Sequence, residues 1–214
     1  MAKLRVHNLA VSLDGFATGE GQSTDAPFGH AGTRLMEWFF PTHTFVAMTG
    51  HESEAVGGGT RGVDDDFAAK TTEGIGAEIM GRGKFGPVWD EDWHGWWGDE
   101  PPFHSPVVVL THHERDELVL GETTFYFRNL APRDALEFAT DLAGGQDVRL
   151  GGGPTTVREF LDADLVDQLH IVVVPILLGR GESVWTGQEG LEQRFSIETT
   201  ASPSGVTHLQ FTRR

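Results

Sequence analysis

Apolar and polar residues alternate at the start of the chain, where Leu4, Val6, Leu9 and Val11 hold the apolar positions. A period of two residues is typical of a β-strand with one buried face. Shorter apolar or alternating runs recur along the sequence and end at glycine, proline or other turn residues. The pattern predicts strands over 4–11, 77–80, 106–110, 123–127, 147–150, 169–178, 194–199 and 206–212.

Four other stretches carry apolar residues at helical spacing between the predicted strands. Aspartates at 64–66 suit the positive N-terminus of one helix, and Pro154 suits the first turn of another. Val157, Phe160 and Leu161 would then face a core. Helices are therefore predicted over 35–40, 64–72, 132–142 and from 154 through 161.

Strands that alternate with helices, followed by a strand-only end, indicate an α/β fold. We expect a mostly parallel central sheet flanked by helices, with antiparallel strands at its C-terminal edge. Residues 17–28 are polar and rich in glycine, which predicts a mobile loop. Residues 88–103 show neither the helical period nor the strand period. Without an internal repeat or a clean linker, residues 1–214 are interpreted as one domain.

Composition narrows the classes of partner. The 16 basic and 32 acidic residues give a formal net charge of −16, which argues against nucleic acid and anionic membranes as partners. The chain has no cysteine, so disulfides and thiolate metal sites are excluded. Its 10 histidines show no metal-binding spacing, and we expect no metal. No signal peptide or membrane span is expected, and a cytoplasmic location fits.

Three consecutive glycines, Gly151, Gly152 and Gly153, separate a predicted strand from a predicted helix. Such a turn presents free backbone N–H groups and a positive helix end at the carboxyl edge of the sheet, which suits a phosphate. Thr155 and Thr156 add hydroxyl donors. The alternative is a merely tight turn, and the glycines alone leave both interpretations open. The spacing matches neither GxGxxG nor a Walker loop.

Polar residues follow two other predicted strands. Gly81 and Arg82 end one strand, and Thr111 with His112 ends another. Because the carboxyl ends of parallel strands meet at one edge, these side chains should lie near the glycines and could neutralise phosphate groups. Taken singly, His112 and the adjacent His113 are each more simply explained as polar loop residues.

Carboxylates and tryptophans are weaker candidates. Asp14 follows the first strand and could relay a proton, although a turn aspartate is the simpler interpretation. A solvated helix cap is likewise the simpler interpretation of the aspartates at 64–66. The four tryptophans at 89, 93, 96 and 97 could stack on a flat substrate, anchor a loop or form a subunit interface.

With these segments in order, the chain resembles the dihydrofolate-reductase-like superfamily, and most closely the riboflavin-biosynthesis (RibD) C-terminal reductase domain family. LGGGPT together with VPILLGRG is the more specific part of the resemblance. The matching segments are SLDGFAT (12–18), EIMGRGKF (78–85), PVVVLTHH (106–113), VRLGGGPTTVREFL (148–161), LVDQLHIVVVPILLGRGESVW (165–185) and GVTHLQF (205–211).

The resemblance implies an NADPH-dependent reductase that stands alone, because the zinc-deaminase motif needs cysteine. It implies three groups of cofactor-binding residues. Gly81, Arg82, Thr111 and His112 would face the adenosine and the 2′-phosphate. The pyrophosphate would contact Gly151, Gly152, Gly153 and Thr155, with Thr156 beside them. Ala10, Ala17 and Gly19 would lie along the nicotinamide and its covering loop.

The substrate site is expected in a cleft bounded by Asp14, Phe16, Trp38 and Asp66. By the resemblance, Asp65 or Asp66 occupies the place of the carboxylate that binds the pterin in folate reductases. The expected substrate is a small heterocycle, pterin- or ribosylaminopyrimidine-like, or an imine or carbonyl compound. A non-catalytic nucleotide-binding module and a structural partner protein remain alternatives. The resemblance also implies a homodimer.

Overall fold

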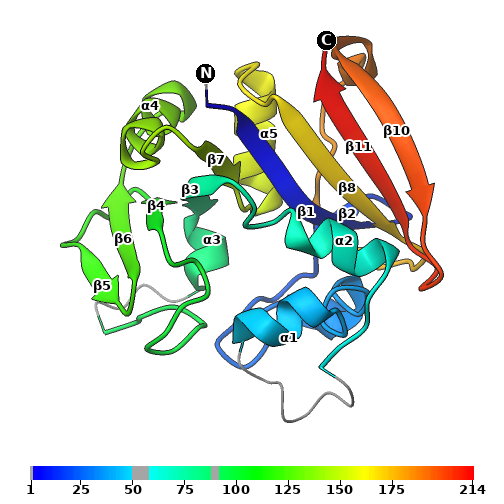
Figure 1. The fold of residues 1–214 in the computed structure, drawn as a ribbon, viewed down its shortest axis with the longest axis horizontal. Helices are drawn as coiled ribbons and strands as arrows, with labels where there is room; N and C mark the ends of the chain where they lie inside the picture. The colour runs from blue at the N-terminus through cyan, green and yellow to red at the C-terminus, as the bar shows by residue number, and fades with distance from the viewer. Residues whose placement is uncertain (1, 50–57, 88–91) are drawn as a thin grey trace.

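The computed structural model describes residues 2–49, 58–87 and 92–214, and its centre is a nine-stranded sheet. The strand order is β10-β11-β8-β1-β7-β3-β4-β6-β5 (Figure 1). Its strands are β1 Leu4–Ser12, β3 Ile75–Gly81, β4 Pro106–Leu110, β5 Leu118–Leu120, β6 Thr123–Arg128, β7 Asp147–Leu150, β8 Gln168–Val174, β10 Phe195–Ala201 and β11 Thr207–Arg213.

Strand direction confirms the predicted fold class. β1 pairs in parallel with β7 and β8, and β3, β4 and β6 continue the parallel part of the sheet. β11 runs antiparallel to β8, and β10 runs antiparallel to β11 at one edge. β5 pairs antiparallel with β6 at the other edge. The mostly parallel sheet and the antiparallel C-terminal strands are both present.

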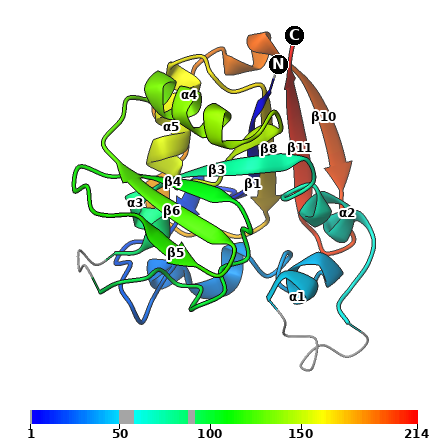
Figure 2. The same ribbon diagram turned by 60° about the vertical axis from the view of Figure 1, so that its left-hand side comes forward.

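Two helices, α4 Pro132–Leu142 and α5 Pro154–Asp162, cover one face of the sheet (Figures 1 and 2). Their Ala139 and Phe160 belong to one buried cluster with Val148 and Ile79 of the strands. Each fully buried large apolar side chain of this kind contributes about 1.5–3 kcal/mol by leaving water. This face carries the main core of the protein.

Shorter helices lie on the opposite face. They are η1 Gly29–Leu35, α1 His43–Thr49, α2 Val63–Ala69 and α3 Arg82–Phe85. A further 3₁₀ turn, η3 Leu191–Arg194, instead adds Leu191 to the core cluster of α4 and α5. Trp38 and Ala68 pack on Val172 of β8, and Phe85 of α3 packs on Met80 of β3. A two-stranded sheet joins β2 Phe16–Thr18 to β9 Glu182–Ser183.

The periodic segments were predicted well. β4, β7 and α4 have the predicted bounds, and α2 and α5 differ from them by a few residues. β8 ends at Val174, before the predicted 178, because Pro175 cannot donate a ladder hydrogen bond. The hairpin between β10 and β11 forms as predicted.

The helix predicted over 35–40 is wrong. The helical segment is the 3₁₀ helix η1, which ends at Leu35, and residues 36–41 form turns. Bulky aromatic residues at 38–40 have low helix propensity, and tertiary packing decides their backbone. Elements without a periodic signal were missed: β2, β5, β9, α1 and α3. Part of the predicted mobile loop, residues 17 and 18, belongs to β2.

Candidate functional site

A cavity of about 700 Å³ lies where β3, β4, β6 and β7 end and α5 begins. It is a carboxyl-edge site of the kind that open α/β sheets use for ligands. Seven of the predicted cofactor residues line it: Gly81, Arg82, Thr111, His112, Gly153, Thr155 and Thr156. The fold therefore brings together the three segments that were predicted to meet at this edge: the end of β3, the residues after β4 and the start of α5.

The three glycines have different local roles. The Gly151 N–H donates to the Ile79 carbonyl, and the Gly152 carbonyl accepts from the Gly81 N–H, both at 2.8 Å. A Cβ on Gly151 would collide with the Glu78 carboxylate, whereas Gly152 and Gly153 have open space. Gly152 has φ +105°, which L-residues with side chains rarely adopt. Gly151 is thus required for packing, Gly152 for backbone conformation, and Gly153 leaves the cavity open.

The N-terminus of α5 points donors at this cavity. Pro154 occupies the first turn, no side chain caps the helix and no acidic residue lies in its first turn. Within the described residues, the backbone N–H groups of Thr155 and Thr156 make no hydrogen bond to the protein. Unpaired N–H groups and the helix dipole together favour an anion at this position.

Arg82 supplies the positive charge in the same cavity. Its Nη1 atom is buried and has no hydrogen-bond partner in the described parts of the chain. His112 is exposed, and its Nδ1 lies 3.1 Å from Asn129 Oδ1. A buried, unsatisfied guanidinium nitrogen is costly unless a ligand accepts from it. The donor set therefore fits a phosphate-bearing ligand.

The remaining predicted cofactor residues do not line the cavity. Ala10 is buried in the apolar cluster below α2, and Ala17 lies in β2. A Cβ on Gly19 would collide with the backbone of Phe28 and Ala31, so this glycine allows close packing. Gly151 and Gly152 lie behind the lining, next to Gly153. Their contacts with a cofactor stay predictions.

Asp14 is held as an acceptor. Its carboxylate accepts from Ser12 Oγ at 2.6 Å and from the backbone N–H groups of Leu178 and Gly179 at 3.1 and 2.6 Å. The Ser12 hydrogen bond, with help from the two N–H groups, lowers the pKa of Asp14 to about 2. An ionised carboxylate of this kind ties the β1–β2 turn to the segment after β8 and is a poor proton donor near neutral pH.

The aspartates of α2 are directed to other partners. Asp65 is buried and accepts from the Thr44 N–H and from Thr44 Oγ1, both at 2.7 Å, which fixes the first turn of α1. Asp66 is exposed, and Asp64 accepts from His208 Nε2 at 2.9 Å. None of the three lines the 700 Å³ cavity. The catalytic role predicted for Asp65 and Asp66 stays a prediction, and the observed contacts of Asp65 are structural.

The predicted substrate residues Phe16 and Trp38 share one apolar cluster. Trp38 is only 5% exposed, and its ring meets His208 edge-on at 5.3 Å. The turns at residues 36–41 fold the aromatic side chains inward, since an indole gains most by leaving water. The structure therefore places Trp38 in a core, where we had expected it to border an open cleft. Phe16 is half-buried.

The Trp-rich segment anchors α3. Trp93 and Trp96 donate from Nε1 to the carbonyls of Phe85 and Lys84, at 3.0 and 2.9 Å. Trp97 lies parallel to Phe125 of β6 with the ring centres 6.2 Å apart. Among the interpretations left open, loop anchoring is the one these contacts bear out. Trp89 lies outside the described residues.

Sequence reasoning missed a buried ion cluster beside the glycines. Glu78 of β3, 3% exposed, accepts from Lys84 Nζ at 2.6 Å and from Arg149 Nη1 at 2.8 Å. Burial lowers the pKa of Lys84 to about 8, although the Glu78 carboxylate opposes this shift. The position of Glu78 inside an apolar strand could have predicted this cluster, because a buried carboxylate needs cationic partners.

No helix in the described parts of the chain is long and apolar enough to cross a bilayer. The described residues also contain no cluster of His, Cys, Asp or Glu that could hold a metal ion.

Solved structures share this fold over the whole chain. A protein named for riboflavin biosynthesis from Shewanella sp. PV-4 is 22% identical, with a TM-score of 0.59, and the match covers 100% of this chain and 99% of that one. A pyrimidine reductase-like protein from Corynebacterium diphtheriae is 14% identical, with a TM-score of 0.53 and coverages of 100% and 92%.

A third similar structure is the diaminohydroxyphosphoribosylaminopyrimidine deaminase/5-amino-6-(5-phosphoribosylamino)uracil reductase of Thermotoga maritima. It is 14% identical, with a TM-score of 0.52, and the match covers 100% of this chain but 56% of that one. No curated protein is close enough in sequence to count as a match. The sequence profile of the RibD C-terminal domain matches residues 5–211, so the chain belongs to the RibD C-terminal domain family.

Proposed function

We propose that this protein is an NADPH-dependent reductase that transfers a hydride to a small heterocyclic substrate, pterin- or ribosylaminopyrimidine-like, or to an imine or carbonyl compound. The observation that carries the proposal is the cavity at the carboxyl edge of the sheet, where Arg82 meets the N-terminus of α5. Family membership and the reductases among the similar structures support the same reaction class.

The residues present fit such a cofactor. The unsatisfied Arg82 Nη1 and the exposed His112 suit the phosphate on the adenosine side. The free N–H groups of Thr155 and Thr156 suit a pyrophosphate. When bound, NADPH supplies the hydride. Because the chain carries a net charge of −16, this local set of donors must overcome a repulsive global field.

The protein's own part in the reaction is to hold and orient the reactants. The α5 N-terminus and Arg82 hold phosphate groups. Asp14, as an ionised acceptor, fixes the segment after β8 that faces the β1–β2 turn. We therefore assign Asp14 a positioning role and assign the proton transfer to another group or to water.

Titration of the protein with NADPH and with NADH, followed by tryptophan fluorescence, tests the proposal. We expect saturable quenching by NADPH. Arg82→Ala should raise the dissociation constant for NADPH about 10-fold or more, because a charge-assisted hydrogen bond is lost. The matched control is Arg194→Ala, which removes an exposed ion pair with Asp164 and should leave binding unchanged. Absence of quenching by either cofactor would contradict the proposal.

A non-catalytic binding module is the second candidate. It is favoured by one observation: Asp14 and Asp65, two of the predicted catalytic carboxylates, are both engaged in hydrogen bonds within the fold. NADPH oxidation against a panel of pterins, flavin precursors and small carbonyl compounds separates the two. Binding without oxidation of NADPH by any of them favours the module.

We also propose that the protein is a homodimer of single-domain chains. Light scattering at two protein concentrations tests this assembly, and a mass of one chain at both would contradict it.

A further inference from the structure

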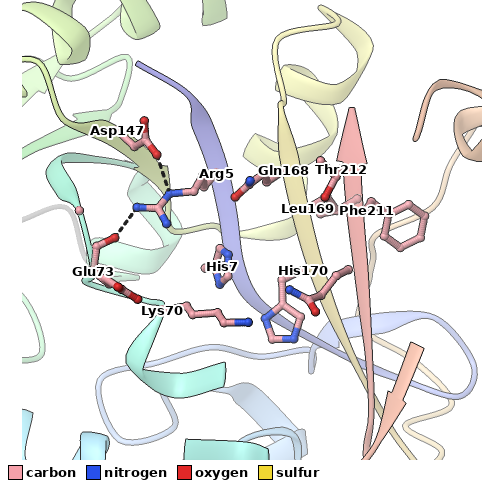
Figure 3. Close-up of a pocket in the computed structure, with 12 residues that line it drawn as sticks. Arg5, His7, Lys70, Glu73, Asp147, Gln168, Leu169, His170, Phe211 and Thr212 are labelled. Carbon is pink, nitrogen blue, oxygen red and sulfur yellow. Dashed lines mark hydrogen bonds and ion pairs between the residues drawn. The ribbon is translucent and has the colours of Figure 1, made fainter. Parts of the chain in front are cut away.

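A second cavity, of about 480 Å³, lies at the opposite edge of the sheet from the candidate cofactor site (Figure 3). β3 and β7 run from one edge to the other. The residues at their starts, Gly74 and Asp147, line the second cavity. Gly81 at the end of β3 and Gly153 just after β7 line the first cavity. The two cavities have no lining residue in common. The second cavity is therefore a separate place on the molecule.

Its walls present nitrogen atoms from β1, β8 and the end of α2. In Figure 3 the Lys70 side chain extends below His7, and its ammonium group points toward His170. Lys70 forms no ion pair with any residue in the described parts of the chain, and its only ring contact there is with Phe67, 4.6 Å from the ring centre. This ammonium group lies among imidazoles, and no carboxylate of the described residues is within ion-pair distance of it.

The two histidines are buried and neutral. His7 is 7% exposed and His170 is 1% exposed. Burial is the main cause that lowers the pKa of both: with help from Arg149 it brings the pKa of His7 to about 3, and with help from the neighbouring histidines and Lys70 it brings that of His170 to about 2. His170 contacts Asn8 Oδ1 and His208 Nδ1, both at 3.0 Å. The His7 Nδ1 atom, by contrast, is buried without a hydrogen-bond partner among the described residues.

The acidic residues at the rim do not satisfy these groups. Asp147 accepts from the Lys3 N–H at 2.8 Å and pairs with Arg5 Nε at 3.2 Å. The Glu73 side chain is exposed, and only its carbonyl receives the Arg5 guanidinium. Gln168, Gln210 and Thr212 line the cavity, and their side chains make no hydrogen bond to the rest of the described protein. Several donors without a protein partner thus converge on one hollow, and its two carboxylates lie at the rim.

We propose that this cavity binds a small polar molecule through a phosphate or carboxylate group held by Lys70. The oxyanion accepts from the Lys70 ammonium, and the amides of Gln168 and Gln210 and the Thr212 hydroxyl contact the rest of the ligand. A volume of about 480 Å³ leaves room for a body larger than the anion itself. The proposal does not depend on the reductase function.

Imidazole NMR signals of the full chain provide the test. Inorganic phosphate and malonate are titrated separately at constant ionic strength, with sodium chloride as the non-specific anion. We expect a saturable shift of the His7 and His170 signals with phosphate or with malonate, and the responding anion identifies the chemical source. A linear, non-saturating response to both anions, equal to that of chloride, would overturn the proposal.

Two variants make the test specific. Lys70→Met should raise the dissociation constant about 10-fold, because the charged partner is lost. Lys3→Met is the matched control, since this lysine is exposed and its side chain does not line the cavity, and it should leave the constant unchanged. If Lys70→Met is unfolded by circular dichroism, Gln168→Ala replaces it and should weaken binding measurably. Unchanged affinity in a folded variant would refute the site.

Discussion

At the scale of single residues, Gly151 shows how much a missing side chain can matter. Its Cα faces the Glu78 carboxylate and the Lys84 ammonium so closely that no Cβ fits. The neighbouring Gly152 has open space but a backbone conformation that favours glycine. The sequence presents three identical letters, and the structure gives them different physical reasons.

Gly151→Ala should therefore destabilise the protein by about 1–3 kcal/mol, because overpacking forces the ion cluster or the strand to move. Urea denaturation measures this loss. Gly83→Ala is the control: its Cβ would meet only Gln22 Oε1 at 4.0 Å, so the free energy of unfolding should stay within about 0.5 kcal/mol of the wild type. Equal stability of both variants would show that the Gly151 contact is not tight.

Glu78 is the second residue whose substitution should cause a large loss of stability. Glu78→Gln leaves the partly buried Lys84 and Arg149 without their carboxylate, and loss of one partner of a buried ion pair costs up to about 3–5 kcal/mol. Urea denaturation at neutral pH should show this loss. Glu117→Gln, which breaks an exposed pair with Arg128, should change the free energy of unfolding by no more than about 1 kcal/mol. Similar losses in both variants would contradict the special status of Glu78.

At the scale of elements, the fold depends on polar side chains that join segments distant in sequence. Asp65 of α2 holds the first turn of α1, and Asp14 holds the segment after β8. These contacts fix short elements that have too few residues to be stable alone. They also explain why no local sequence pattern predicted α1: its position depends on the Asp65 carboxylate, which is 21 residues from Thr44.

Asp65→Ala should destabilise the protein by about 1–2 kcal/mol, the range found for loss of a helix-capping carboxylate. Asp66→Ala is the matched control, since that side chain is exposed on the same helix and its loss should cost less than about 0.5 kcal/mol. Thermal unfolding of both variants measures the difference. A larger loss in Asp66→Ala would reverse the assignment.

At the scale of the whole molecule, buried neutral histidines make stability depend on pH. Below pH 6.5 the unfolded chain takes up protons at His7 and His170, whereas the folded chain does so only near pH 3 and 2. Their contribution is therefore fully present above pH 6.5 and decreases as the pH falls, by up to about 1.4 kcal/mol per pH unit for each histidine.

His7→Gln should reduce the slope of unfolding free energy against pH between about 6 and 4, because one proton fewer is taken up on unfolding. Urea denaturation over this range measures the slope. His94→Gln, at an exposed position, should leave it unchanged. An unchanged slope in His7→Gln would mean that His7 is protonated in the folded protein.

Much of the architecture followed from local patterns in the sequence. β4, β7 and α4 were predicted with their observed bounds, because hydrophobic period and terminal residues are properties of a few consecutive positions. The carboxyl-edge cavity also followed, since Arg82, His112 and the glycines come directly after strands of a parallel sheet. The sequence by itself thus determined the order of the main strands and helices, the class of fold and the edge that carries the candidate site.

Only the tertiary structure decided what the polar side chains contact. Glu78 meets Arg149 across 71 residues, and Asp14 meets Gly179 across 165, so no local spacing could reveal either pair. The same holds for the burial of Trp38 and for the cavity that gathers Lys70 and His7 from separate elements. Backbone periodicity is a local property, whereas a side chain's partner is chosen by the packing of the whole sheet and its helices.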